Sequence, residues 1–389
     1  MKRYLSESFR AWCLILPLVA FLAVFFVWPL FTMMKGSVSD PVGMQVFPAI
    51  SAATVKWDRQ SDPSVEMRDA LLKDLRADTD QQLMGDMVRR LNSAQPGFRT
   101  LMARTIEAVK SGGDVDLASV DKRWSDIRFW QALADSTKPY TDRYFLAALD
   151  YKRNAAGEIE ALPEGESVNK TILFRTLGVS LMVTLACVLL GLPYAMLAAS
   201  LDGWKRQLVL GAVLLPLWTS LLVRTAAWFV LLQDKGLING ALMWLGVTSA
   251  PVHLIFNKIG VVIAMTHVLL PFMVLPIYSV LLTIPRNLMP AAASLGAPPW
   301  RAFYRVLLPL AARGMVSGAL LVFMAAIGYY ITPALIGGAQ DQMISSVIAY
   351  YAINSANWGM AGALGAILLV STFLLYGIYN RLQPNEARP

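Results

Sequence analysis

The sequence predicts an all-α integral membrane protein with six transmembrane helices and a mainly helical block inserted after the first of them. Two observations carry this prediction. The 389 residues are 56% hydrophobic and 15% charged, whereas a soluble domain has roughly 25% charged residues. The apolar residues also gather in six windows, each long enough to cross a bilayer.

The six windows define the expected membrane helices. Such a helix needs ~20 mostly apolar residues, because each residue rises ~1.5 Å and the hydrocarbon layer is ~30 Å thick. The windows have these bounds: 12–34, 171–200, 208–232, 259–284, 315–336 and 360–379. Basic residues precede the first window, as in a signal peptide. Its apolar run continues for over 20 residues without a small-x-small cleavage site, so we expect a retained anchor.

The charged residues are unevenly distributed. Residues 35–170, called the insert below, hold 19 Lys and Arg and 21 Asp and Glu, a net charge of −2. The other residues hold 15 basic and 5 acidic side chains, a net charge of +10. A basic excess beside apolar windows indicates membrane flanks in contact with lipid, and no nucleic-acid partner is expected. We therefore expect three regions: 1–34 with transmembrane helix 1, the insert, and 171–389 with transmembrane helices 2–6.

The same basic residues predict the orientation, because cytoplasmic connections carry most of the Lys and Arg. With the N-terminus inside, the cytoplasmic segments hold Lys2, Arg3, Arg10, Lys205, Arg206, Arg286, Arg301, Arg305, Arg313, Arg381 and Arg388. The short outer loops, 233–258 and 337–359, hold only Lys235 and Lys258. Six helices then place both termini in the cytoplasm and the insert on the extracytoplasmic side.

The insert shows helical periodicity, for example over 65–72 and 98–104. Pro63, Pro96 and Pro139 separate such stretches, so we expect four or five helices. The insert has no His and no Cys, and its acidic and basic residues alternate as on a solvated helix face. This composition does not favour catalysis. It leaves two interpretations: a cap packed on the membrane part, or a docking surface for a soluble binding protein.

The segment 286–313, between the fourth and fifth windows, is the most informative part of the chain. Its Ala-rich residues 291–295 favour a short helix, and Gly296 can supply a left-handed C-terminal turn. Pro298 or Pro299 suits the first turn of a second helix that leads into the fifth window. Two helices joined by a sharp turn form an element that a cytoplasmic partner can grip and move.

This segment resembles the EAA loop of ABC importer permeases, whose pattern is Glu-Ala-Ala, three residues, Gly, nine residues, Ile-x-Leu-Pro. The matching residues are Ala291, Ala292, Gly296, Val306, Leu308 and Pro309. Pro290 stands where the family usually has Glu, so the salt bridge that this Glu can make to the ATPase is absent here. Similar stretches at 192–195, 218–224, 235–239 and 333–359 are closest to the spermidine/putrescine branch of these permeases.

The resemblance implies a type I ABC importer permease fold in the bacterial inner membrane. The implied partners are a second permease subunit in a heterodimer, two cytoplasmic ATPase subunits and an extracytoplasmic solute-binding protein. The implied solute is a polyamine such as putrescine or spermidine. The resemblance also implies that the loop is the coupling helix that docks on the ATPase, through Ala291, Ala292, Ser294, Leu295, Gly296, Ala297, Arg301, Phe303, Leu308 and Pro309.

The chain itself is not expected to be an enzyme. A P-loop holds phosphate with a Lys that directly follows a Gly, and none of the 12 lysines follows a glycine. ATP and Mg are therefore expected on the partner ATPase, and neither a cofactor nor a metal on this chain. The two cysteines, Cys13 and Cys187, lie in apolar windows and are expected to be packing residues.

Five side chains inside the windows are candidates for the solute path: Tyr194, Trp218, Arg224, Trp228 and His267. Arg224 lies ~12 Å from the outer end of the third window at ~1.5 Å per residue, where an Arg is costly unless it faces the bundle or water. It either snorkels or bonds to a helix carbonyl, or it lines the path or a gate. His267 is either a packing residue or a proton relay, and the aromatic residues either pack or stack on a cationic amine. No carboxylate lies well inside any window, so an ammonium solute would be selected mainly outside.

Three alternatives remain open at this point. The importer could carry another small organic solute, such as an amino-acid derivative or an opine. The chain could be a membrane sensor whose insert binds a ligand, although its cytoplasmic parts are too short for a kinase. It could also be a secondary transporter, although midplane charges and inverted repeats are not visible.

Overall fold

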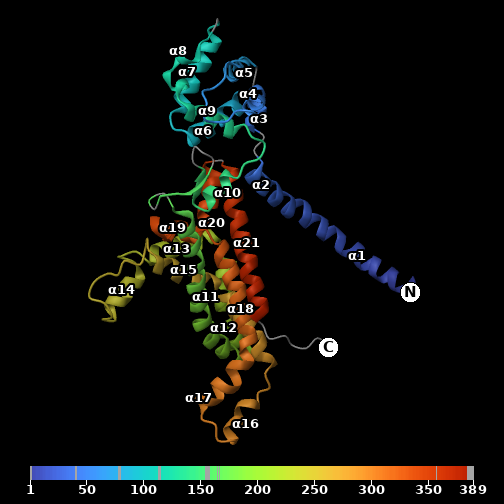
Figure 1. Cartoon of the computed structure of the whole chain (residues 1–389). Helices are drawn as coiled ribbons and strands as arrows, with labels where there is room; N and C mark the ends of the chain where they lie inside the picture. Colours follow the sequence, from blue (N-terminus) through green and yellow to red (C-terminus); the bar gives the residue numbers. More distant parts are fainter. Residues whose placement is uncertain are drawn as a thin grey trace. The chain divides into compact units, whose positions relative to one another are not determined.

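The computed structural model describes residues 2–39, 42–77, 80–112, 115–153, 158–163, 165, 167–355 and 357–382. Arg388, one of the expected cytoplasmic charges, lies outside these residues. The chain forms two compact units, one of residues 1–167 with 355–366 and one of residues 168–354 with 367–389 (Figure 1). In the described part of the chain, all regular structure is helical except for one two-stranded hairpin.

The first unit begins with a long helix made of α1 (Lys2–Leu22), the wide turn η1 (Ala23–Val27) and α2 (Trp28–Val38). Its part Trp12–Val38 is apolar and long enough to cross a membrane. The insert follows with α3 (Val42–Val46), α4 (Pro48–Thr54), α5 (Val65–Arg76), α6 (Gln81–Ala94), α7 (Phe98–Lys110), α8 (Leu117–Val120), η2 (Lys122–Ser125), α9 (Ile127–Ser136) and α10 (Arg143–Ala148). The antiparallel hairpin of β1 (Tyr151–Arg153) and β2 (Ile159–Ala161) comes after α10.

Short polar side chains begin several insert helices. Ser64 at the start of α5 and Asp126 at the start of α9 each accept a hydrogen bond from a backbone N–H of the first turn. Asp74 of α5 is buried and accepts from the N–H groups of Ala49 and Ile50, at 3.0 and 2.9 Å. This carboxylate satisfies the first turn of α4 and ties the two helices together.

The core of the insert is largely aromatic. Phe98, Trp124, Phe129 and Trp130 are all buried. The ring centroids of Trp124 and Trp130 lie 5.1 Å apart, and those of Phe98 and Phe129 lie 5.2 Å apart. Such pairs stabilise a core by more than the burial of their apolar area alone, so the insert has a well-defined interior.

The expectation of four or five insert helices was wrong, because the described residues hold more and shorter helices and also the hairpin. Repeated Asp and Ser caps restart the helix after short stretches. Asp116, Asp121 and Asp126, for example, each cap a separate helix within one short stretch. Apolar periodicity alone does not distinguish one long helix from several capped short ones.

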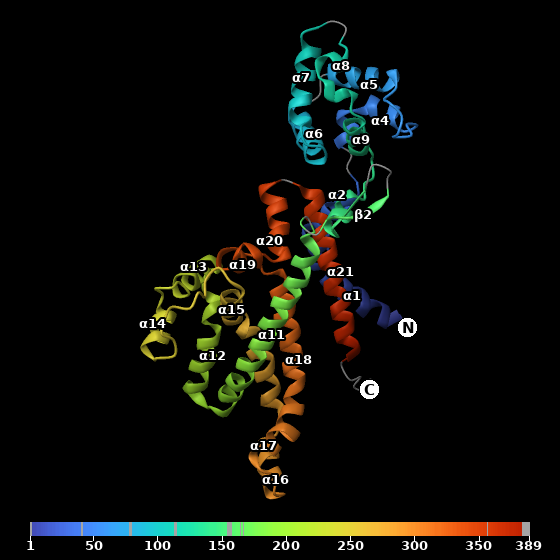
Figure 2. The same ribbon diagram turned by 60° about the vertical axis from the view of Figure 1, so that its left-hand side comes forward.

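The second unit holds α11 (Asn169–Ser200), α12 (Gly203–Trp218), α13 (Leu221–Leu231), α14 (Leu237–Trp244), α15 (Lys258–Thr283), α16 (Leu288–Ser294), α17 (Pro299–Ala302), the wide turn η3 (Phe303–Leu307), α18 (Leu308–Gly328), α19 (Ile331–Ile336), η4 (Ala339–Asp341), α20 (Ile344–Ala349) and η5 (Tyr350–Asn354). The last helix, α21 (Trp358–Leu382), has residues in both units. Figure 2 shows α11, α15 and α18 side by side as the long helices of the second unit.

Glycines allow the long helices to approach closely. A Cβ atom placed on Gly314 of α18 would lie 2.8 Å from Ile277 Cα, and one on Gly318 would lie 2.8 Å from Met273 Sδ. On α11, a Cβ atom at Gly191 would lie 2.7 Å from Met273 Cγ. Small residues favour helix association in a bilayer because they let backbones come into van der Waals contact.

Five of the described helices are long and apolar enough to span a membrane, and there are six spans if the bent pair α12 and α13 counts as one. This confirms the predicted all-α membrane fold. The third window corresponds to this bent pair, in which α12 and α13 meet at 102°. Thr219 and Ser220 have extended backbone between the two helices. The distance of Arg224 from the outer end of this window was calculated for one continuous helix, so it does not apply to the bent pair.

The fifth window, 315–336, was placed too far along the chain. The apolar helix runs from Pro299 to Gly328, and α19 is a separate short helix. The chain leaves the helical conformation at Tyr329, which has extended backbone. Apolar composition continues across this break, so the window could not show it.

Candidate functional site

The segment between α15 and α18 folds as two short helices joined at Gly296. The N–H of Gly296 donates to the carbonyl oxygen of Ala293 at 2.9 Å, and that of Ala297 donates to Ala292 at 3.0 Å. Gly296 has a φ of +80°. This pair of bonds with a left-handed glycine is the Schellman arrangement, which ends α16 and reverses the chain. Pro299 begins α17, where its missing N–H costs nothing.

The second short helix continues into α18 through the wide turn η3. Pro309 has no N–H for a bond to the carbonyl of Arg305, and its ring needs space there, which accounts for the widened turn. The continuity means that α17, η3 and α18 form one helix of 30 residues, from Pro299 to Gly328.

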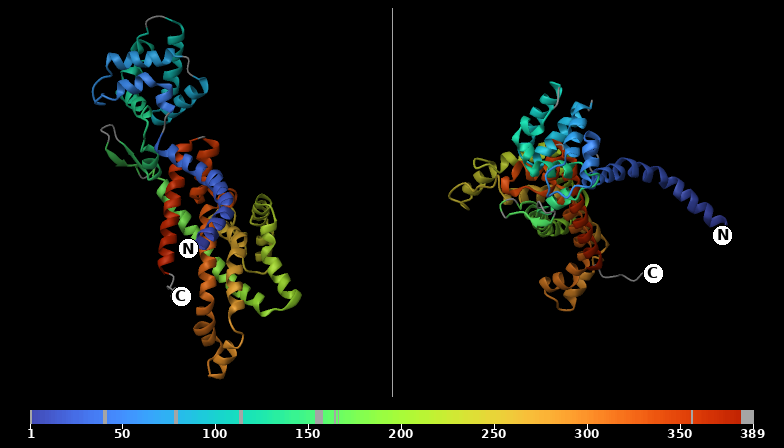
Figure 3. Two further views of the ribbon diagram at one scale, coloured as in Figure 1. Left: turned by 90° about the vertical axis from the view of Figure 1, so that its right-hand side faces the viewer. Right: turned by 45° about the horizontal axis from the view of Figure 1, so that its top comes forward.

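The tip of this element is exposed within the chain. Leu295 is 89% exposed, and Trp300 and Tyr304 are 62% and 61% exposed. No residue of α16 is buried. In Figure 2 and on the left of Figure 3, α16 and α17 extend beyond the ends of α15 and α18. Exposed large apolar side chains on a projecting element are typical of a protein-binding surface.

Of the five candidate path residues, the structure brings three together. The Trp228 Nε1–H of α13 donates to His267 Nδ1 of α15 at 3.1 Å. Arg224, one turn before Trp228, donates through Nη2 to the carbonyl oxygen of Thr219 at 2.7 Å. Tyr194 lies apart from them, with its hydroxyl donating to the carbonyl oxygen of Val209 at 2.6 Å, and it ties α11 to α12.

The remaining candidate, Trp218, ends α12 and is 77% exposed. The structure also shows residues that the windows did not single out. Tyr329 lies close enough to Arg224 to interact with its guanidinium group. The hydroxyl groups of Thr225 and Thr332 are 3.2 Å apart and join α13 to α19. Nothing in the apolar pattern marks this contact, because it depends on the bend before α13.

Polar contacts show which connections of the second unit lie at each end of α11. Asp202, which follows α11, pairs with Arg206 at 2.6 Å and with Arg286 at 3.6 Å. The connection from α11 to α12 and the connection from α15 to α16 therefore both lie at the C-terminal end of α11. At the other end of α11, Thr176 Oγ1 accepts from the N–H of Ile344 at 2.9 Å. The basic connections and the weakly charged loops thus lie at opposite ends of α11.

Within the described residues, no group of three or more His, Cys, Asp or Glu side chains could hold a metal ion. Two features of the second unit stand out: the exposed pair of short helices α16 and α17 at one end, and the small polar cluster between α13 and α15.

The family follows from comparison with known proteins. The chain belongs to the binding-protein-dependent transport system inner membrane components, whose family model matches residues 191–388. It is therefore a multi-pass inner membrane permease subunit of an ABC importer, and it is not an enzyme and needs no cofactor of its own. The match begins at residue 191, so the insert lies outside it.

Among its relatives, the chain is 35% identical over 210 residues to the spermidine/putrescine transport system permease protein PotB of Escherichia coli (strain K12), covering 54% of this chain and 76% of that protein. It is 36% identical to PotB of Haemophilus influenzae, covering 54% of this chain and 73% of that protein. The inner membrane ABC transporter permease protein YdcU of Escherichia coli is 31% identical over 222 residues, covering 54% of this chain and 68% of that protein.

A solved structure, a bacterial alginate ABC transporter in complex with an alginate pentasaccharide-bound periplasmic protein, aligns with a TM-score of 0.44 and 18% identity. The alignment covers 55% of this chain and 77% of that chain.

Proposed function

We propose that this chain is one of two different permease subunits that together form the path for a polyamine, such as putrescine or spermidine. A solute-binding protein delivers the solute from outside, and two cytoplasmic ATPase subunits supply the energy. The support for the solute is the similarity to spermidine/putrescine permeases over about half of this chain. Binding of putrescine and spermidine, and of amino-acid derivatives and opines as competitors, by the cognate binding protein tests this part.

The proposed orientation places both termini, the α16–α17 element and the Asp202 connection in the cytoplasm. The basic connections at one end of α11 support it, because Lys and Arg accumulate on the cytoplasmic side. The insert then lies outside as a region of its own between 1–34 and 171–389. There it acts as a cap or as a docking surface for the binding protein.

The proposed coupling element is the segment from Ala291 to Pro309, which docks in a groove of the ATPase. The observation that carries this proposal is the left-handed turn at Gly296, which projects the exposed Leu295 and Trp300 from the end of the unit. Because α17 continues into α18, movement of the docked tip shifts a membrane helix as a rigid body. ATP hydrolysis on the partner thus moves a helix of the permease.

The substitution Gly296→Val tests the coupling element. A β-branched residue is strained at φ +80°, so the turn opens and the tip loses its shape. We expect at least a tenfold loss of putrescine uptake and of solute-stimulated ATPase activity in the reconstituted transporter, together with loss of ATPase copurification.

The matched control is Gly203→Val. Gly203 also has a positive φ, +59°, with no atoms within 4 Å of an added Cβ, and it lies at the same end of the unit. It carries the same backbone cost outside the coupling element, so ATPase binding is retained. If both variants lose the ATPase equally, or if Gly296→Val keeps full uptake, the coupling role is wrong.

A further inference from the structure

Arg224 and His267 occupy a polar face of the second unit. α15 is the most enclosed of the candidate spans, with 56% of its apolar window buried, yet His267 in its middle is exposed. Arg224 lies one turn before Trp228 on α13, and Trp228 contacts His267. Ionisable side chains in a membrane helix face protein or a water-filled cavity, because lipid cannot solvate them. In the assembled transporter this face therefore lies against another subunit or a water-filled path.

The guanidinium group of Arg224 is held at the break between α12 and α13. Its Nη2 donates to the Thr219 carbonyl oxygen at 2.7 Å, and its Nε donates to Thr219 Oγ1 at 3.3 Å. The carbonyl groups at the end of a helix lack helical N–H partners and carry partial negative charge; that of Pro216 accepts from the Thr219 hydroxyl at 3.0 Å. The broken helix thus positions the cation without neutralising it.

No carboxylate balances this charge in the described spans. The helices α11, α12, α13, α15 and α18 contain no Asp or Glu. The groups that accept from Arg224, the carbonyl oxygen and the hydroxyl of Thr219, are uncharged. Trp228 Nε1 can only donate, so His267 Nδ1 accepts, and the proton of the neutral imidazole is on Nε2. The cluster therefore presents one full positive charge and a further N–H donor to the path.

We propose that Arg224 is an electrostatic barrier in the closed permease that prevents small inorganic cations from leaking through the solute path. A fixed positive charge excludes cations from a narrow path in this way. At ~5 Å and an effective dielectric constant of ~20, its repulsion lowers the local concentration of a monovalent cation on the order of 100-fold. The inference rests on the proposed function only in treating this chain as one half of a solute path.

A cationic solute meets the same barrier, so Arg224 has to move during transport. The extended backbone at Thr219 and Ser220 provides a hinge, because only these two residues separate α12 from α13. Thr225 couples α13 to α19 through the contact of its hydroxyl with that of Thr332. A shift of α13 together with α19 carries Arg224 away from the Thr219 carbonyl and opens the barrier.

The test measures passive K⁺ flux into liposomes that contain the complete transporter without ATP. We expect Arg224→Gln to raise the flux at least tenfold over wild type, because the amide keeps a hydrogen bond and removes the charge. Arg224→Lys keeps the charge and is expected to keep the flux within about twofold of wild type. Arg175→Gln, on α11, is the control for loss of an arginine from a membrane helix.

Size-exclusion profiles and ATPase binding identify variants that fail to assemble. If Arg224→Gln does not assemble, the variant His267→Glu is measured instead. A carboxylate at this position neutralises Arg224 in place and should raise K⁺ flux similarly. Unchanged K⁺ flux in the assembled Gln or Glu variant overturns the proposal, as does equal leakage of the Lys and Gln variants. Failure of polyamine uptake with the expected K⁺ fluxes would overturn the proposed solute and leave the barrier intact.

Discussion

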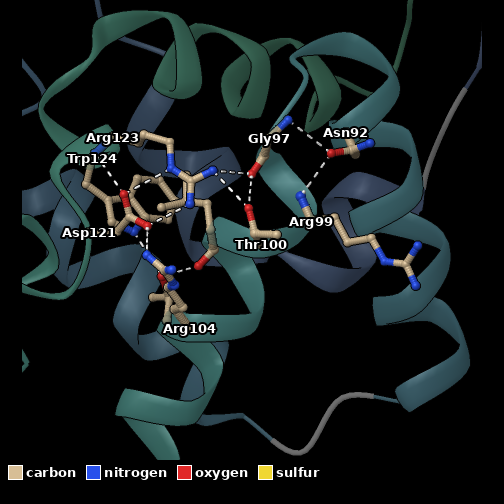
Figure 4. Close-up of polar contacts among 10 residues, drawn as sticks. Asn92, Gly97, Arg99, Thr100, Arg104, Asp121, Arg123 and Trp124 are labelled. Atoms are coloured by element: carbon tan, nitrogen blue, oxygen red, sulfur yellow. Dashed lines mark hydrogen bonds and ion pairs between the residues drawn. The ribbon is translucent and has the colours of Figure 1, made fainter.

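Asp121 shows how a single carboxylate organises the insert (Figure 4). It accepts from Arg123 Nη2 at 2.7 Å and from Arg104 Nη1 at 3.1 Å, and its side chain is 7% exposed. The bonds from Arg123, above all, hold the pKa of Asp121 well below its usual value. A carboxyl group whose pKa falls on folding stabilises the fold above its unfolded pKa of ~3.9. That stability is lost as the pH falls toward the folded pKa.

The substitution Asp121→Asn is therefore expected to lower the unfolding free energy of the insert by about 1–3 kcal/mol at neutral pH. The difference from wild type should begin to shrink below about pH 4. Hydrogen exchange of insert peptides in the full chain, in detergent, measures both. Asp86→Asn, which removes an exposed pair with Arg89, is the control and should cost under about 1 kcal/mol. A pH-independent difference would contradict the role assigned to Asp121.

At the same scale, the sequence could nominate path residues but not their partners. It left open whether Arg224 bonds to a carbonyl, and the structure shows that it does, at Thr219. It could not pair Trp228 with His267, because their contact joins two helices and depends on the 102° bend before α13. A hydropathy window treats such a pair of helices as one straight rod.

Elements whose ends are set by local chemistry were the most predictable. Gly296 and Pro299 mark a turn and a helix start through their own backbone restrictions, and the structure has both features there. The ends of spans set by tertiary contacts were not predictable. Tyr329, for example, leaves α18 inside an apolar stretch, and the carbonyl oxygen at this break accepts from the hydroxyl of Ser345, far along the chain.

The packing of α15 against α18 gives a prediction for these two elements. Gly314→Ala places a Cβ 2.8 Å from both Ile277 Cα and the Pro276 carbonyl oxygen, so backbone has to move. We expect a loss of roughly 1–3 kcal/mol and a lower Tm in detergent. Gly211→Ala on α12 is the control, because nothing lies within 4 Å of its Cβ and Ala favours a helix. A lower Tm for Gly211→Ala, or an unchanged Tm for Gly314→Ala, would contradict this packing argument.

At the scale of the whole molecule, family membership follows from residues 191–388, whereas the insert and the span Trp12–Val38 lie outside that match. The change in charge composition at residues 35 and 170 is the basis on which the sequence predicts the boundaries of the insert. The role of the insert depends on surfaces of other subunits, which a single chain does not encode. The side of the membrane on which the insert lies can nevertheless be measured, and the proposed orientation places it opposite the coupling element.

Cysteine labelling tests this topology with two positions that are on opposite sides in the proposed orientation. Cys13 is exposed and Cys187 is buried, so Cys13→Ser gives a background without a reactive thiol. In that background, Ser119→Cys in the insert should react with a membrane-impermeant maleimide in intact spheroplasts. Ser294→Cys in α16 should react only after permeabilisation. Labelling of both from the same side would remove the basis for a cytoplasmic coupling element, because positive charge would then no longer mark the inner face of this chain.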